Sequence, residues 1–193
     1  MKLNKLLFCG LMAAFTAAGS LLKIPVPGTP LIITLQTFFV FMSGLLLEPK
    51  YAFLSQLAYA AIGLVGLPVF SEGGGIAYVL RPSFGFIVGF CVCAPLISLI
   101  VRRNLLEYIS AKSGRLKPMV KTLTGALASV AAMYAVGSLY MFTILNLYVG
   151  QPKSLWAVVV SATGIFIVID IIKFAFAIPL CVAIQKRISK LLL

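Results

Sequence analysis

The chain has 193 residues, of which 62% are hydrophobic and 10% charged, and its mean hydropathy is +1.12. Such a composition excludes an ordinary soluble domain and indicates a polytopic helical membrane protein. The net charge is +12, but the basic residues fall in short connections between apolar runs, which argues against nucleic-acid binding. There is no histidine, and the four cysteines lie in apolar runs, so we expect no metal site and no enzyme activity.

Six apolar stretches follow one another along the chain: 6–22, 31–47, 51–68, 83–101, 122–146 and 154–185. They predict one all-α domain over residues 1–193, a bundle of six transmembrane helices. The shorter stretches need flanking residues or a locally thin bilayer to cross it. The last stretch is too long for one span, and we expect "SATG" (161–164) to break it, leaving 165–185 as the membrane helix. Lys2 and Lys5 before the first stretch imitate a secretory signal, but we expect an uncleaved helix.

The basic residues divide unequally between the two sides of these stretches. Twelve fall on one side and three on the other, with Lys173 left inside a stretch. By the positive-inside rule, both termini are then cytoplasmic. The larger group is Lys2, Lys5, Lys50, Arg102, Arg103, Lys112, Arg115, Lys117, Lys121, Lys186, Arg187 and Lys190, and the smaller is Lys23, Arg81 and Lys153.

The first stretch carries small residues four apart, which permit close helix packing. They are Gly10, Ala13, Ala14, Ala17 and Ala18. Two explanations stay open, namely internal packing and docking against another membrane subunit.

Two outer connections have unusual composition. The first, "KIPVPGTP" (23–30), has three prolines and should be extended and stiff. The second (66–86) contains Gly73, Gly74 and Gly75 between Phe70 and Tyr78, with Arg81 nearby. The glycine run lacks the Gly-Lys-Ser/Thr ending of a nucleotide-binding loop, so this chain should not hydrolyse ATP. It is either a flexible loop or a lid over a pocket.

Asp170 and Lys173 interrupt the last apolar stretch, where each charge is costly. Three residues apart on a helix, they share a face. They either pair for purely structural reasons or line a cavity near the outer end of the helix. Thr34 and Gln36, at the start of the second stretch, need hydrogen-bond partners, which either a neighbouring helix or a ligand can provide.

Three motifs in this order resemble the BioY family, the biotin-binding S components of energy-coupling factor (ECF) vitamin transporters. They are "TLQTF" after the proline-rich loop, "GLPVF" before the glycine run, and the late Asp-x-x-Lys. The resemblance covers essentially the whole chain. The chain departs from the family pattern at "LEPK" (47–50) and at "RPS" (81–83). It also departs at Val168 and Ile169, where members often carry Pro-Gly.

The resemblance implies a six-helix subunit of the bacterial plasma membrane that captures biotin from outside, with no cofactor of its own. Its partners would be membrane lipid, a transmembrane coupling protein and two ABC ATPases, which alone use ATP. The coupling protein would dock on the first-helix face formed by Ala13, Ala14, Ala17 and Ala18. The alternative function is an ion-coupled secondary transporter of a small organic solute, although the sequence shows no second half that repeats the first.

Biotin chemistry then gives each candidate residue an expected role. Asp170 would accept a ureido N–H. Lys173 would bond the ureido carbonyl or the carboxylate, with Arg81 as an alternative carboxylate partner. Thr34 and Gln36 would add polar contacts. A lid would be formed by Phe70 and Tyr78, which cover the ligand, and by Gly73, Gly74 and Gly75, which let the loop fold over it.

Overall fold

The computed structural model describes residues 2–27, 31–103 and 116–191. Lys112 and Arg115, used above to set the topology, lie outside this range. The described residues form six α-helices: α1 (Lys2–Leu21), α2 (Gln36–Leu46), α3 (Pro49–Leu64), α4 (Phe84–Leu96), α6 (Leu116–Leu147) and α7 (Leu155–Leu191). Two short strands, β1 (Lys23–Pro25) and β2 (Ile32–Thr34), pair in an antiparallel hairpin between α1 and α2. A 3₁₀-helix, η1 (Ile76–Leu80), precedes α4, and a π-helical turn, η2 (Ile97–Arg102), continues it.

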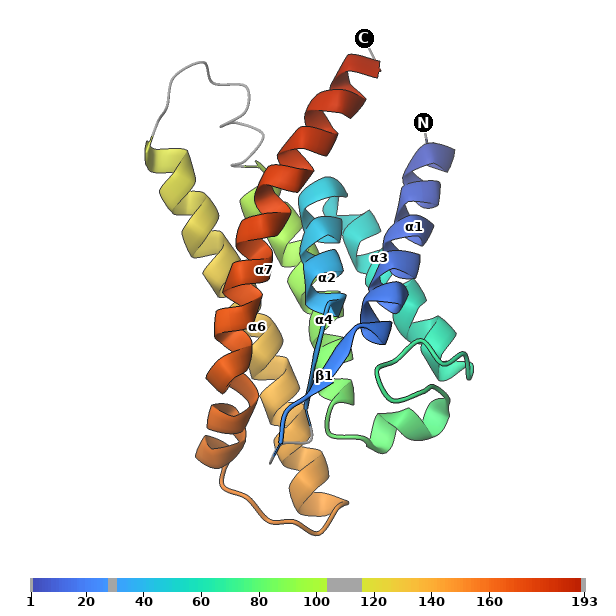
Figure 1. Cartoon of the computed structure of the whole chain (residues 1–193), viewed down its shortest axis with the longest axis vertical. Coiled ribbons are helices and arrows are strands. Elements are labelled where there is room, and N and C mark those ends of the chain that lie inside the picture. The colour runs from blue at the N-terminus through green and yellow to red at the C-terminus, as the bar shows by residue number, and fades with distance from the viewer. Residues whose placement is uncertain (1, 28–30, 104–115, 192–193) are drawn as a thin grey trace.

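The helices pack side by side in a closed ring in the order α1, α3, α4, α6, α7 and α2, and α2 also contacts α4. The two termini lie at one end of the molecule, whereas the hairpin, η1 and the α6–α7 connection lie at the other end (Figure 1). Within the described ranges, four helical segments are long and apolar enough to cross a membrane: Asn4–Leu21, Phe84–Arg102, Val120–Leu147 and Leu155–Gln185. The chain is therefore a multi-helix membrane bundle, and six crossings stay a prediction.

The second apolar stretch differs from its expected form. Residues Ile32–Thr34 form strand β2, and α2 begins only at Gln36. The β-branched residues Ile32, Ile33 and Thr34 favour an extended strand, and Leu35 N–H donates to Gly19 O and Leu22 O at the end of α1. The eleven-residue α2 rises about 16 Å, roughly half of the hydrocarbon core.

The last apolar stretch bends where the break was expected. Gly164 has φ −26° and ψ −106°, which is not helical, while the residues on both sides of it continue α7. Val168 and Ile169 are helical, so Asp170 projects from a regular turn. The kink lies about a turn and a half before Asp170, as the sequence predicted.

Helices α4 and α6 approach each other closely. A Cβ built on Gly85 would lie 2.3 Å from Tyr140 Cβ and 3.0 Å from Gly137 O, so only glycine fits there. Close backbone approach of this kind is how helices gain packing in a bilayer.

Candidate functional site

A cavity lies among α2, α4, α6 and α7, and strand β2 forms part of its wall. Its empty space, counted together with the part that opens to the surroundings, is about 620 Å³. Its lining combines apolar and hydroxyl-bearing side chains with one carboxylate and one ammonium: Leu31, Ile32, Ile33, Thr34, Gln36, Thr37, Ser71, Tyr78, Ser83, Phe86, Ile87, Phe90, Met133, Tyr134, Ala162, Phe166, Asp170 and Lys173.

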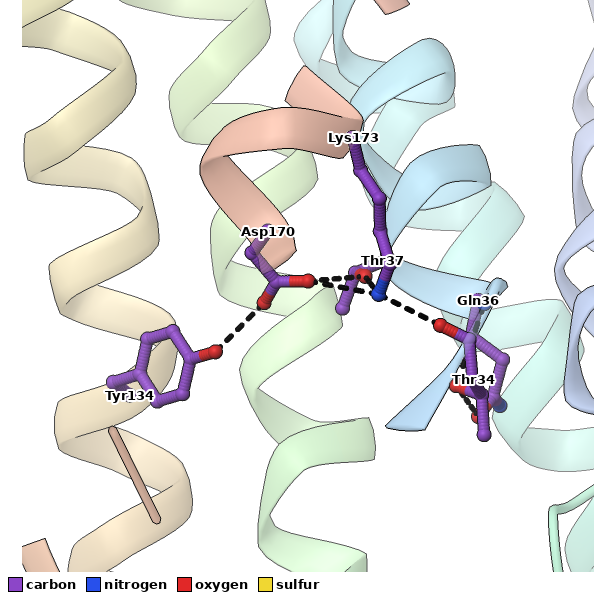
Figure 2. Close-up of polar contacts among 6 residues, drawn as sticks. All are labelled: Thr34, Gln36, Thr37, Tyr134, Asp170 and Lys173. Atoms are coloured by element: carbon purple, nitrogen blue, oxygen red, sulfur yellow. Dashed lines mark hydrogen bonds and ion pairs between the residues drawn. The ribbon is translucent and has the colours of Figure 1, made fainter. Parts of the chain in front are cut away.

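The Asp170 carboxylate accepts three hydrogen bonds in the cavity wall. Thr37 Oγ1 donates to Oδ1 at 2.6 Å, Lys173 Nζ donates to the same oxygen at 3.0 Å, and Tyr134 OH donates to Oδ2 at 2.7 Å (Figure 2). Only 3% of the residue is exposed. These donors come from α2, α6 and α7 itself, so the carboxylate is fixed where three helices meet.

Lys173 makes three hydrogen bonds, one for each ammonium proton. Nζ lies 2.7 Å from Thr34 O, 2.8 Å from Thr37 Oγ1 and 3.0 Å from Asp170 Oδ1. Its side chain is 12% exposed. A buried ion pair is tolerated when its charges are mutually close and otherwise hydrogen-bonded, and both conditions hold here.

Gln36 belongs to a second chain of hydrogen bonds. Its Oε1 accepts from Thr34 Oγ1 at 2.8 Å, and its Nε2 donates to the Tyr59 hydroxyl. Tyr59 OH in turn donates to Val69 O at 3.2 Å. Gln36 thus links the cavity wall to α3 and to the loop after it.

The lining residues of the α3–α4 connection form a separate group of hydroxyls. Tyr78 OH lies 3.2 Å from Ser71 Oγ and 3.5 Å from Ser83 Oγ. Lys23 Nζ, on β1, donates to Ser71 O at 2.8 Å. The cavity therefore carries a second polar group besides the Asp170 cluster.

Apolar side chains make up the rest of the wall. Phe86, Ile87 and Phe90 come from α4, Met133 from α6 and Phe166 from α7. Apolar walls with a few placed polar groups are typical of small-molecule sites. The chemistry suits a ligand with a largely apolar body and hydrogen-bonding groups at its ends.

Five of the ten residues predicted to bind substrate line this one cavity: Thr34, Gln36, Tyr78, Asp170 and Lys173. The other five are Phe70, Gly73, Gly74, Gly75 and Arg81, and they lie outside the lining. Phe70 is 3% exposed and packs against the rings of Tyr59 and Tyr78, with centroids 5.5 and 4.6 Å away. The Phe70 ring therefore packs against Tyr78, a lining residue, without lining the cavity itself.

The glycine run forms a hydrogen-bonded turn. Gly73 and Gly75 have φ of 118° and 100°, which other residues rarely adopt. Gly73 N–H and Phe70 N–H each donate to the other residue's carbonyl, and Gly75 N–H donates to Gly63 O at 2.7 Å. A Cβ on Gly74 would lie 2.1 Å from Leu67 O. The run thus fixes the loop onto the end of α3.

Arg81 lies outside the cavity lining and has partners of its own there. Its guanidinium lies 2.9 Å from Glu72 Oε1 and over the ring of Tyr78, 5.5 Å from the centroid. About half of its side chain is exposed. Arg81 therefore contacts the outer side of a residue that lines the cavity.

Several lining residues escaped the sequence analysis, above all Thr37 and Tyr134. Thr37 lies in the "TLQTF" motif, one residue after Gln36, so that motif carried a usable signal. Tyr134 is one of three tyrosines between residues 134 and 148, the others being Tyr140 and Tyr148, and nothing in the sequence separates them. Only the helix rotation in the folded bundle brings Tyr134 to Asp170.

The predicted docking face of α1 divides into two sides. Ala13 is buried against the bundle and Ala17 half-buried, whereas Ala14 and Ala18 are exposed. Gly10 is exposed in line with them. Internal packing accounts for Ala13, and the exposed pair leaves a small-residue stripe on the outside.

Comparison with known proteins gives consistent matches. A sequence profile described as the BioY family matches residues 1–190. A protein named probable biotin transporter BioY from Lysinibacillus sphaericus is 40% identical over 152 residues, covering 79% of this chain and 71% of its own. A protein of the same name from Pyrococcus horikoshii is 34% identical, with 96% of this chain and 98% of its own covered.

A solved structure agrees with these sequence matches. It is a crystal structure of the S-component for biotin from an ECF-type ABC transporter, which is 27% identical to this chain. The two superpose with a TM-score of 0.77 over 96% of this chain and 92% of the other. Together, the profile and the relatives show that the chain belongs to the BioY family.

Proposed function

We propose that this chain is the biotin-binding S component of an ECF-type ABC transporter, and that it captures biotin from outside the cell for ATP-driven uptake by partner subunits. One observation carries the proposal: a buried, hydrogen-bonded Asp170–Lys173 pair faces a largely apolar cavity. Family membership and the solved biotin S-component support it. The chain is a transport subunit and not an enzyme.

The ureido ring of biotin fits the Asp170 cluster. Oδ2 accepts one hydrogen bond, from Tyr134, and a carboxylate oxygen can accept another. A ureido N–H bonded there would make a charge-assisted hydrogen bond in a poorly hydrated site. An analogue without that N–H would be strongly rejected, since the site would keep an unsatisfied acceptor.

The carboxylate of biotin fits the cluster of three hydroxyls that Ser71, Tyr78 and Ser83 contribute. Lys173 has all three protons engaged, and Arg81 is paired with Glu72 outside the lining. We therefore place the valerate at these hydroxyls and the ureido ring at Asp170, with Thr34 and Gln36 beside it. Phe70, Gly73, Gly74 and Gly75 would act through Tyr78 and the loop that holds it.

The assembly partners follow from the S-component role. We propose that a transmembrane coupling protein docks on the exposed stripe of α1, at Ala14 and Ala18, with Ala13 and Ala17 behind them. Two ABC ATPases would complete the module. Residues 1–193 would form a single domain that crosses the bacterial plasma membrane six times, with both termini in the cytoplasm.

Titration calorimetry of the purified protein with a panel of vitamins tests this proposal. Biotin should bind and the other vitamins should not. Asp170→Asn should weaken biotin binding by more than tenfold, because a hydrogen bond to a charged group contributes about 1.5–3 kcal/mol. Wild-type affinity in a folded Asp170→Asn protein would exclude this pocket. Ion-driven uptake of biotin by the chain alone in liposomes would favour a secondary transporter instead.

A further inference from the structure

Tyr59, on α3, lies behind the cavity wall and is not one of the lining residues. It is 1% exposed, yet its hydroxyl makes two hydrogen bonds. The hydroxyl accepts from Nε2 of Gln36, the first residue of α2, and donates to Val69 O in the connection after α3. Its ring packs edge-on against Phe70, with centroids 5.5 Å apart. Tyr59 therefore joins a lining residue of α2 to the α3–α4 connection.

These hydrogen bonds run in a fixed direction. Val69 O is a carbonyl oxygen and can only accept, so the single hydroxyl proton of Tyr59 is used there. The Tyr59 oxygen is left as an acceptor, and Gln36 must turn its NH₂ group towards it. The amide oxygen of Gln36 then faces Thr34, whose hydroxyl donates to it at 2.8 Å (Figure 2). An amide side chain can point either way round, and here its partners select one orientation.

We propose that Tyr59 is a positioning residue that sets the orientation of the Gln36 amide in the cavity. Nε2 has a second proton and Oε1 a second lone pair that the bonds to Tyr59 and Thr34 do not use. The wall formed by the end of β2 and the start of α2 thus has a defined pattern of donors and acceptors. The inference rests on the proposed function, because biotin is the ligand whose polar groups would meet this pattern.

A double-mutant cycle on biotin affinity tests the proposal. Tyr59→Phe removes only the hydroxyl, Gln36→Met replaces the amide with an apolar side chain of similar length, and a third variant carries both changes. We expect Tyr59→Phe to weaken binding about fivefold when Gln36 is present and less than about twofold in the Gln36→Met background. Tyr51→Phe, the same change on the same helix outside the lining, should leave affinity unchanged.

An equal loss in both backgrounds would overturn the proposal, since Tyr59 would then act independently of Gln36. No loss in either background would overturn it too. Thermal unfolding of the ligand-free proteins repeats the cycle without biotin, and it decides the question if Gln36→Met binds too weakly to measure. We expect the melting-temperature changes to be non-additive, and additive changes would contradict the bond between the two side chains. A wild-type protein that binds no biotin contradicts the proposed function instead, and the melting cycle then still tests the role of Tyr59.

Discussion

Tyr134 and Thr37 donate their hydroxyl protons to different oxygens of one carboxylate, Asp170. Asp170 and Lys173 could be predicted from the sequence, because a charge in an apolar stretch is costly and needs a partner. The role of Tyr134 could not be predicted, because a tyrosine in an apolar helix is compatible with many different surroundings. The difference is physical: a charge restricts its surroundings, whereas an amphipathic ring does not.

Tyr134→Phe should weaken biotin binding by roughly tenfold, because Asp170 Oδ2 loses its donor while the ring stays in place. Tyr148→Phe makes the same chemical change at an exposed position just after α6 and should leave affinity unchanged. Calorimetry on the two folded variants gives the comparison. Equal affinities would show that the Tyr134 hydroxyl does not help to position the carboxylate.

Arg81→Gln should change biotin affinity less than threefold. Its guanidinium is half exposed and paired with Glu72, and exposed ion pairs contribute about 0–1 kcal/mol. Competition binding with labelled biotin measures the effect. A tenfold loss would instead make Arg81 the carboxylate partner and displace the hydroxyls of Ser71, Tyr78 and Ser83 from that role.

At the scale of elements, the hairpin and α2 show where hydropathy misleads. Residues 31–47 are predominantly apolar, which predicts one span, yet the chain forms a strand and then a short helix. Short apolar runs do not distinguish a strand from a helix. The kink at Gly164 was predictable, because its signal is local. The hairpin depends on pairing between residues on either side of the proline-rich loop, which hydropathy does not report.

Gly85→Ala should destabilise the bundle, because the added Cβ would lie 2.3 Å from Tyr140 Cβ and force α4 away from α6. We expect a loss of about 1–3 kcal/mol, as for other overpacked cores. Gly10→Ala is the matched control, since a Cβ there meets nothing within 4 Å. Thermal unfolding in detergent compares them, and equal melting temperatures would mean that the contact between α4 and α6 can relax freely.

At the scale of the molecule, the structure places the two termini on a common side, and the orientation of that side in the membrane stays a prediction from charge. Both termini lie at one end of the bundle, and the hairpin and η1 lie at the other end (Figure 1). Twelve basic residues were assigned to the side of the termini from the sequence alone. That assignment changes side at each apolar stretch, so it requires the second stretch, which contains α2, to cross the membrane.

Fusion of a fluorescent protein to either end should therefore give fluorescent cells, because that reporter matures in the cytoplasm. Alkaline phosphatase fused at the same ends should be inactive, since it requires export. Active phosphatase at one terminus would show an odd number of crossings and would contradict the six-span topology.

The spacing of Asp170 and Lys173 also has a consequence for biogenesis. Each charge alone adds about 2.5–3.5 kcal/mol to the insertion of a helix into the bilayer. Because the two lie three residues apart on α7, with Nζ and Oδ1 3.0 Å apart, they can neutralise each other while that helix leaves the translocon. Thr37 and Tyr134 need to arrive only later. The same ion pair divided between two helices would expose two uncompensated charges to lipid during assembly.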